Sequence, residues 1–412
     1  WPGPEREARR SPDIARPVRW SSMGAGNPHL VERLQEFGVT IFAEMSALAA
    51  DTGAINLGQG FPDTDGPSVV AEAAVAAIRA GHNQYPPGPG IEPLRRAVAD
   101  HQHRFYGLNV DPDEVLVTAG ASEGLAAALL ALVEPGQEVV TFEPYFDFYA
   151  AAIAMAGGRR RVVTLHTPDY SFDPDDLVAS IGPATRMILL NSPHNPTGKV
   201  FDADELAWVA RLAIEHDLLV VTDEVYEHLV FDGATHIPIA TLPGMAERTL
   251  TVSSAAKTFG FTGWKIGWVH GPAELVAAVR TAKQFLTYVN GAPFQHALVT
   301  ALALDDDYFV GLATDMAAKR DLLCAGLEAA GFEVFRPGGT YYATVDITPL
   351  GADSGVDFCR ALPGRCGVVA VPNEVFYDNK RIGRPLVRFA YCKRPEVLAE
   401  AADRLSTLRQ VH

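Results

Sequence analysis

The chain has 412 residues, of which 48% are hydrophobic and 20% are charged, and its formal net charge is −16. This length suffices for one large and one smaller domain, and the composition is typical of a globular protein rather than a disordered one. The acidic balance argues against nucleic acid or an anionic membrane as the main partner, although a local cationic pocket can still bind a small anion.

Taken in chain order, the first 34 residues are expected to form a flexible arm, since they begin with a Pro- and Arg-rich stretch without the apolar core of a signal peptide. We expect residues 35–64 to pack against a small domain. From 65 to 305, short apolar runs alternate with Ala/Leu-rich segments of helical period, which predicts a large α/β domain with a mostly parallel sheet. The expected strands are 114–120, 137–144, 161–165, 186–193, 218–225, 249–254 and 266–271.

The pattern changes after residue 305. A long helical segment, "DYFVGLATDMAAKRDLLCAGLEAAG", leads to "GGTYYATVDI", further short pieces and a terminal helix. This predicts a smaller α+β domain over 306–412.

Polar residues follow several of the expected strands. They include Ser122, Asn195, Asp223 and Lys257, which are far apart in the sequence. Because ligands of open α/β sheets bind outside the carboxyl ends of the strands, we expect these residues to meet in one cleft.

Lys257 is one of only seven lysines, and it lies in the run "TVSSAAKTFGFTGWKIGWVHG" together with Lys265. A lysine on a tight turn, beside a second cation and aromatic side chains, has its charged form disfavoured, which suits attack on a carbonyl carbon. The alternative is an ordinary surface lysine.

A phosphate site is suggested by Ser254 and Lys265 in the same run. The string "TAGAS", which contains Ala121 and Ser122, adds the N–H groups of a helix N-terminus. Either feature is weak by itself.

Two buried charges need partners. Asp223 ends the apolar strand "LLVVTDEV", and a protonated pyridine nitrogen beside it would offset the free-energy cost of burying its carboxylate. The alternative is that Asp223 caps the N-terminus of a helix. Arg388 lies inside the apolar string "PLVRFAYC", where it binds either an anionic substrate or an internal carboxylate.

The ordered strings "INLGQGFPD", "NQYPPGPGIEPLRRAV", "TAGASEGL", "EPYFDFY", "NSPHNPTG", "TDEVYEHLVFDG", "SSAAKTFGFTGWKIGW", "GGTYY" and "VRFAYCK" cover the chain from about residue 35. In this order they resemble the fold-type I, class I/II aminotransferases that use pyridoxal 5'-phosphate. The resemblance implies a large domain with a mostly parallel, seven-stranded sheet plus a smaller α+β domain. It also implies a homodimer whose active sites are shared between subunits. The four cysteines have no CxxC or metal-type spacing, and we expect them to be reduced thiols of a cytoplasmic protein.

By position, the resemblance assigns roles to individual residues. Lys257 would carry the cofactor as a Schiff base, and Asp223 would face its ring nitrogen. Cofactor contacts would further come from Ala121, Ser122, Phe146, Asn195, Tyr226, Ser254 and Lys265, and from Tyr85 toward the neighbouring subunit. The substrate would contact Gly60, Asn195, Arg388, Phe42 and, from the partner subunit, Tyr288.

The likeness is strongest to kynurenine/glutamine-type and actinobacterial N-succinyldiaminopimelate aminotransferases. It implies a bulky amino donor, which would be aromatic, kynurenine, glutamine, methionine or an acylated diaminopimelate, and 2-oxoglutarate or another 2-oxo acid as acceptor. The loop "VPNEVFYDN" departs from the Pro-Gly-Ser that many relatives have there, so specificity transfers less readily than chemistry.

Other functions are weaker interpretations. A pyridoxal-phosphate C–S β-lyase would use the same scaffold. The string Gly120–Gly124 matches the G-x-S-x-G of serine hydrolases, with Ser122 as nucleophile, but leaves Lys257, Asp223 and Arg388 unexplained. A non-catalytic DNA-binding regulator would need an added domain. The sequence shows no metal-ligand spacing, and His101-Gln-His103 is most simply a helix surface.

Overall fold

The computed structural model describes residues 28–38 and 40–411. The predicted arm therefore falls outside the described residues over positions 1–27. The first described element is a short 3₁₀ helix, Glu32–Leu34.

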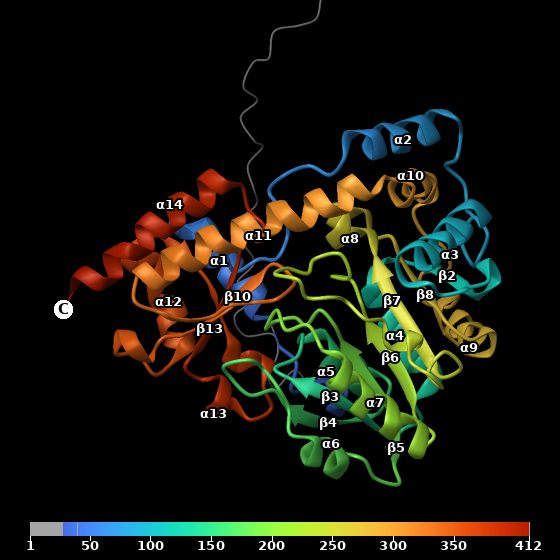
Figure 1. Cartoon of the computed structure of the whole chain (residues 1–412), viewed down its shortest axis with the longest axis horizontal. Coiled ribbons are helices and arrows are strands. Elements are labelled where there is room, and N and C mark those ends of the chain that lie inside the picture. The colour runs from blue at the N-terminus through green and yellow to red at the C-terminus, as the bar shows by residue number, and fades with distance from the viewer. Residues whose placement is uncertain (1–27, 39, 412) are drawn as a thin grey trace, which may run out of the picture.

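A seven-stranded sheet forms the centre of the molecule (Figure 1), in the strand order β2-β8-β7-β6-β5-β3-β4. Only β8 runs antiparallel to its neighbours. The predicted fold class is confirmed, and each predicted strand corresponds to one strand of this sheet. The strands are β2 (Val115–Thr118), β3 (Glu138–Glu143), β4 (Arg159–Thr164), β5 (Thr185–Asn191), β6 (Leu219–Asp223), β7 (Thr249–Ser254) and β8 (Gly267–His270).

Both faces of this sheet are covered by helices, which explains why its strands are apolar without alternation. In β5, Ile188 and Leu190 pack with α7 on one face, whereas Met187 and Leu189 pack with α4 and α5 on the other. The helices of this part of the chain are α2 (Ser68–Arg79), α3 (Glu92–Tyr106), α4 (Gly120–Leu132), α5 (Phe148–Met155), α6 (Pro174–Ser180), α7 (Ala203–Glu215), α8 (Ala255–Thr258), α9 (Ala273–Lys283) and α10 (Ala292–Leu302).

Local sequence signals set the ends of these helices. Asp202 caps α7 through bonds to the backbone N–H groups of Asp204 and Glu205, in the capping box that the Asp-rich start of the segment favours. In α3 the expectation of a polar surface is wrong for His101, which is only 3% exposed, although His103 is exposed. His101 is buried because residues from other segments of the chain pack against it, which the pattern of its own helix does not show.

The C-terminal part of the chain forms a second, antiparallel sheet in the order β12-β13-β10-β9. The N-terminal segment packs with it: β1 pairs in parallel with β11, and Met45 and Leu57 belong to the same apolar core. The elements are α1 (Ile41–Thr52), β1 (Ile55–Asn56), α11 (Asp306–Ala329), β9 (Glu333–Phe335), β10 (Tyr342–Asp346), α12 (Gly355–Cys366), β11 (Val368–Val369), β12 (Val371–Pro372), α13 (Lys380–Gly383), β13 (Leu386–Ala390) and α14 (Pro395–Ser406).

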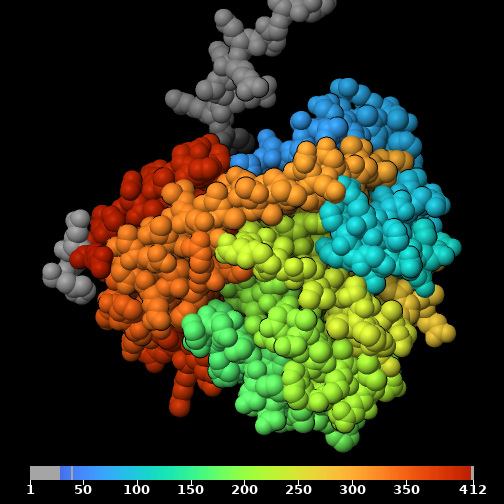
Figure 2. Space-filling model, viewed as in Figure 1, coloured from blue at the N-terminus to red at the C-terminus, as the bar shows by residue number. Residues whose placement is uncertain are grey.

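Helix α11 joins the two parts of the molecule. Its Phe309 packs with α3, β2 and α10, whereas its Leu323 belongs to the core of the C-terminal part. In the space-filling view this helix (orange) crosses the surface, and the C-terminal residues (orange to red) pack directly against the central ones (Figure 2). Among the described residues, no helix combines the length and the apolarity that a membrane crossing requires.

Candidate active site

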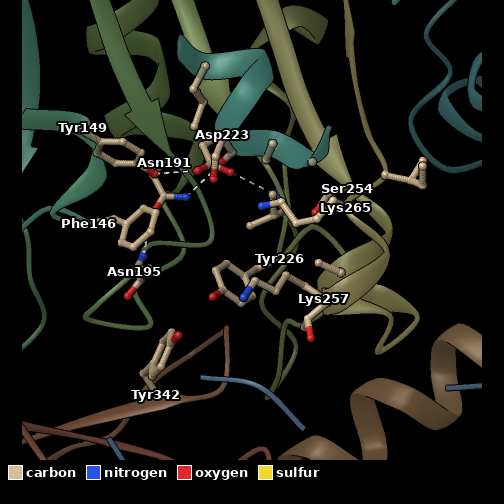
Figure 3. Close-up of a pocket in the computed structure, with 18 residues that line it drawn as sticks. Phe146, Tyr149, Asn191, Asn195, Asp223, Tyr226, Ser254, Lys257, Lys265 and Tyr342 are labelled. Carbon is tan, nitrogen blue, oxygen red and sulfur yellow. Dashed lines mark hydrogen bonds between the residues drawn. The ribbon is translucent and has the colours of Figure 1, made fainter. Parts of the chain in front are cut away.

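A cavity of about 180 Å³ opens at the carboxyl ends of the parallel strands. Its walls come from the residues that follow β2, β3, β5, β6 and β7, together with one tyrosine of the C-terminal part (Figure 3). Of the predicted site residues, the lining contains Ala121, Ser122, Phe146, Asn195, Asp223, Tyr226, Ser254, Lys257 and Lys265. The position is the one expected for ligands of an open α/β sheet.

Asp223 ends β6 at the inner end of this cavity and is 4% exposed. The Tyr149 hydroxyl donates a hydrogen bond to its Oδ2 (2.7 Å), and the backbone N–H of Val225 donates to its Oδ1 (3.3 Å). Burial raises the pKa of the Asp223 carboxyl to about 6, and these hydrogen bonds oppose the rise. No helix begins at Asp223, so the N-cap interpretation is wrong.

Asn191, at the end of β5, holds the neighbouring loop in place. Its Nδ2 donates to the carbonyl oxygens of Asp223 (2.8 Å) and Pro193 (3.1 Å), and its Oδ1 accepts from the backbone N–H of Asn195 (2.8 Å). These bonds fix the start of "NPTG" beside Asp223, because they satisfy buried backbone groups that would otherwise be unpaired.

Lys257 lies in the short helix α8 directly after β7, and its side chain points into the cavity beside Tyr226 (Figure 3). The Tyr341 hydroxyl donates to the carbonyl oxygen of Gly60, so it is free to accept from Lys257 Nζ at 2.8 Å. Lys257 Nζ also lies 3.4 Å from the Gly60 oxygen. The amine is thus held between the N-terminal segment and the C-terminal sheet.

The opposite end of the cavity suits an anion. Helix α4 begins here with Gly120, and a Cβ added to that glycine would lie 3.4 Å from Lys265 Nζ, so the amine adjoins the helix N-terminus. The first N–H groups of a helix have no partner within it and carry partial positive charge. Ser122 and Ser254 add hydroxyl groups to the same lining.

The same arrangement requires glycine at position 267. A Cβ there would lie 2.6 Å from the Gly120 backbone carbon, so only glycine allows β8 to pack this closely against the start of α4.

Arg388 lies in β13 and is 1% exposed. It donates from Nη1 to the side-chain oxygen of Asn195 (2.9 Å) and from Nη2 to the carbonyl oxygen of Gly58 (3.1 Å). Its Nε has no partner among the described residues, and within the same residues it forms no ion pair. The guanidinium therefore keeps hydrogen-bonding capacity and its full charge for an anionic ligand, which favours the substrate interpretation over an internal salt bridge.

Aromatic rings surround these charges. The Arg388 guanidinium lies 3.9 Å from the ring centroid of Tyr342 and 5.1 Å from that of Phe42. Tyr226 is buried, and burial raises the pKa of its phenol well above the ordinary value, so the hydroxyl stays protonated and can donate a hydrogen bond.

A family model, Aminotransferase class I and II, matches residues 52–405 of this chain. The chain belongs to this family of aminotransferases.

Individual relatives agree with this assignment. The aminotransferase is 52% identical over 392 residues to a probable N-succinyldiaminopimelate aminotransferase of Mycobacterium tuberculosis (strain H37Rv), covering 92% of this chain and 98% of that protein. It is 38% identical over 377 residues to methionine aminotransferase of Escherichia coli (strain K12), covering 91% and 97%. A solved N-succinyldiaminopimelate aminotransferase from M. tuberculosis matches with a TM-score of 0.90 at 53% identity, covering 92% of this chain and 100% of that one.

The residues of this aminotransferase fit a phosphorylated pyridine. Asp223 is a buried carboxylate that forms no ion pair with any described residue, so a protonated ring nitrogen would offset its burial. Lys265 and the N-terminus of α4 offer charge and donors for a phosphate. Lys257 supplies an amine that points into the same cavity, and Phe146 presents a ring to it.

Two predicted residues are not brought to this cavity. Tyr85 and Tyr288 are 82% and 52% exposed, and their rings contact each other with centroids 5.6 Å apart. Both were expected to serve the neighbouring subunit, so their roles stay predictions. Arg388, Phe42 and Gly60 are not in the cavity lining either. Arg388 contacts the lining residues Asn195 and Tyr342, Phe42 contacts Arg388, and the Gly60 oxygen lies 3.4 Å from Lys257 Nζ.

Four residues of the site were not assigned by the sequence: Tyr149, Asn191, Tyr341 and Tyr342. All four lie within the strings "EPYFDFY", "NSPHNPTG" and "GGTYY". What was missing was the direction of each side chain, which the strings alone do not show. For example, a Cβ added to Gly60 would meet the Tyr342 hydroxyl at 1.8 Å, a contact between segments far apart in the chain.

The serine hydrolase interpretation fails on geometry. Ser122 does line the cavity at the start of α4, but no histidine is among the described residues that line it. Without a general base beside it, a serine hydroxyl is a weak nucleophile. Ser122 is better placed as a donor in the anion-binding end.

Proposed function

We propose that this aminotransferase uses pyridoxal 5'-phosphate, bound covalently to Lys257, to move the amino group of an L-amino acid to a 2-oxo acid such as 2-oxoglutarate. The observation that supports this most directly is the placement of one amine, one buried carboxylate and one cationic helix N-terminus around a single cavity. When bound, the cofactor supplies an electron sink for the pair of electrons left by the α-proton of the amino acid.

The chain's own groups then have distinct tasks. Lys257 would hold the cofactor until the amine of the substrate takes its place, and its released Nζ would then move the α-proton. Tyr341 and the Gly60 carbonyl would orient that amine. Asp223 stabilises positive charge on the ring nitrogen, and the phenol of Tyr226 together with the amide of Asn195 donates to the ring oxygen. Arg388 binds the α-carboxylate of the substrate.

Replacing Arg388 by leucine tests the last of these tasks. The variant should raise KM for both amino and oxo acids and lower kcat/KM roughly 10- to 100-fold, since charge-assisted hydrogen bonds to a carboxylate are lost. Arg388→Lys is the control, because it keeps the charge but not the bidentate geometry. Its kcat/KM should lie between those of the wild type and Arg388→Leu. An unchanged KM in Arg388→Leu would show that Arg388 has only a structural role.

The donor is proposed to be bulky. Phe42 and Tyr342 place aromatic rings beside Arg388, the residue proposed to bind the substrate α-carboxylate. Relatives named for N-succinyldiaminopimelate and for methionine support a long side chain.

A panel of donors tests both the activity and this preference. The cofactor-loaded protein is mixed with single amino acids, and conversion of the cofactor to its amine form is followed by absorbance. We expect N-succinyldiaminopimelate, methionine, glutamine, kynurenine or an aromatic amino acid to react fastest, with 2-oxoglutarate reversing the change. Aspartate as the best donor would contradict the preference, and no conversion with any donor would contradict the activity.

We propose a homodimer in the cytoplasm. The exposed Tyr288 contacts Tyr85, and the exposed Phe285 and Leu286 precede Tyr288 closely in the chain; such a group of exposed apolar residues marks an interaction surface. Light scattering should give twice the chain mass, whereas a fully active, cofactor-loaded monomer would contradict the shared site.

The four cysteines form no disulfide, in keeping with the reducing conditions of the cytoplasm. Cell fractionation tests that location.

A further inference from the structure

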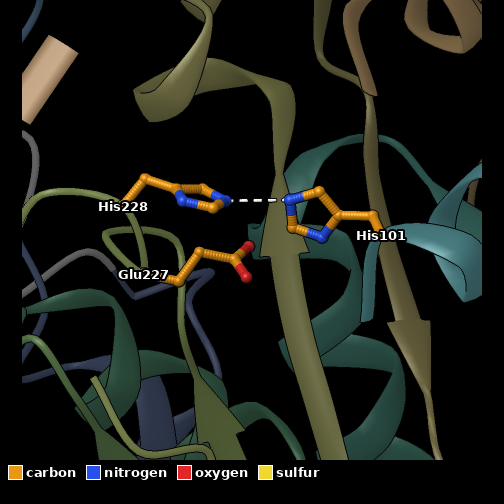
Figure 4. A group of neighbouring side chains, drawn as sticks. All are labelled: His101, Glu227 and His228. Atoms are coloured by element: carbon orange, nitrogen blue, oxygen red, sulfur yellow. Dashed lines mark hydrogen bonds between the residues drawn. The ribbon is translucent and has the colours of Figure 1, made fainter. Parts of the chain in front are cut away.

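A second group of ligand-type side chains lies away from the cavity. His101 of α3 and His228, in the turn after β6, face each other with their Nε2 atoms 2.8 Å apart, and the Glu227 carboxylate points toward the gap between them (Figure 4). One potential ligand atom from each residue lies within 4.8 Å of the others.

The bonding of Glu227 is incomplete. The residue is 4% exposed, and its Oε1 accepts from the Ser253 hydroxyl at 2.7 Å. Its Oε2 is buried and has no hydrogen-bond partner of ordinary geometry among the described residues, although the Tyr106 hydroxyl lies near the carboxylate. A buried carboxylate oxygen without a donor is costly, and a cation is one of the few ligands that would satisfy it.

The surroundings of His101 also suit a ligand role. Gln102 places its amide 3.5 Å from His101 Nδ1, and the amide oxygen has no partner among the described residues. The oxygen and nitrogen of an amide are interchangeable assignments. With the amide turned over, its oxygen accepts from Nδ1–H, which leaves the lone pair of Nε2 for a metal, as in the hydrogen bonds that orient metal-bound histidines.

An apolar shell encloses the group. Phe309 lies with its ring centroid 4.4 Å from that of His228, and Phe105 lies 4.7 Å from that of His101.

We propose that His101, Glu227 and His228 form a site for a divalent transition metal ion of the Zn²⁺ type. Two imidazoles and one carboxylate are a ligand set that Zn²⁺ takes, with a water in the fourth position. Zinc–nitrogen bonds of about 2.0–2.1 Å at tetrahedral angles separate two nitrogens by about 3.3 Å, so the rings need to move apart by about half an ångström.

The site would act as a structural clamp behind the active site. Tyr226 and Ser254 line the catalytic cavity. Glu227 directly follows Tyr226, and its hydrogen-bond partner Ser253 directly precedes Ser254. Metal bound here would tie α3 to the two strand ends that carry those residues. The proposal is independent of the catalytic one, because it concerns residues outside the cavity lining.

Metal content tests the proposal. The full-length, cofactor-loaded protein is purified after growth with zinc, exchanged against a weak chelator, and measured by mass spectrometry of its metals. We expect about one Zn²⁺ per chain. Glu227→Gln keeps the size of the side chain and an acceptor for Ser253. It should reduce the affinity for Zn²⁺ by at least the roughly 10- to 100-fold that is lost when a group hydrogen-bonded to a metal ligand is removed.

His101→Ala should have the same effect as Glu227→Gln, and His103→Ala is the matched control, since His103 is an exposed histidine of the same helix. Gln102→Leu should weaken binding roughly 10- to 100-fold. The Co²⁺-substituted protein should show the intense visible bands of four-coordinate nitrogen and oxygen ligands without thiolate absorbance. Wild-type protein without metal, or equal metal content in wild type and His101→Ala, would overturn the proposal.

Discussion

Lys257→Ala is expected to abolish covalent attachment of pyridoxal phosphate and nearly all turnover. General acid–base catalysis alone contributes roughly 10²- to 10⁴-fold, so losing the proton-transferring amine together with the attachment point should reduce kcat by about 10⁴-fold or more. The Tyr341 hydroxyl and the Gly60 carbonyl, which contact Lys257 Nζ at 2.8 and 3.4 Å, have no chemistry that replaces it.

Two measurements separate this effect from damage to the fold. Borohydride reduction followed by peptide mass spectrometry should fix the cofactor on Lys257 in the wild type and nowhere in the variant. Lys265→Ala is the matched control: it removes the amine beside the start of α4 and should weaken cofactor affinity while leaving covalent attachment possible at saturation. Near-normal activity in Lys257→Ala would refute the assignment.

Asp223→Asn is expected to slow removal of the substrate α-proton. An amide cannot stabilise a protonated ring nitrogen as a carboxylate does, and loss of one preorganised electrostatic partner typically costs on the order of 10²- to 10³-fold in kcat. Stopped-flow absorbance of the half-reaction with the amino donor measures this step. An unchanged rate would count against the role of Asp223.

Although Asp223→Asn should lower activity, it should raise the stability of the cofactor-free fold at neutral pH. In the cofactor-free chain, burial raises the Asp223 pKa from 3.8 to about 6, so between these values the folded state binds more protons than the unfolded state. The free energy of unfolding therefore falls as pH rises through this window, and the loss persists at neutral pH. A shift of this size corresponds to about 3 kcal/mol at most.

Thermal unfolding of the cofactor-free proteins at pH 4 to 7 checks this sign. Asp223→Asn should unfold at a higher temperature than wild type at pH 7, and the difference should shrink toward pH 4. Tyr149→Phe is the control, since loss of the hydrogen bond to Oδ2 should raise the Asp223 pKa further. A less stable Asp223→Asn at pH 7 would indicate that the carboxylate has a structural role in the free chain.

Much of the architecture could be predicted from local patterns. The strand segments were recognisable because a parallel sheet covered on both faces requires continuous apolar residues, as in β5. The convergence of Asp223, Asn195 and Lys257 followed from the rule that strand ends of such a sheet share one edge. The start of α7 was marked by Asp202, whose capping role depends only on residues within three positions.

What the sequence by itself determined, then, is the fold class, the family and which residues at the strand ends meet in the cavity, because these depend on short-range periodicity and on ordered strings. Only the tertiary structure decided the contacts between segments far apart in the chain. Tyr341 meets Lys257 across 84 positions, and His101 meets His228 across 127. Side-chain direction and the burial of a polar helix residue depend on which neighbours arrive from elsewhere, and periodicity within one helix contains no such information.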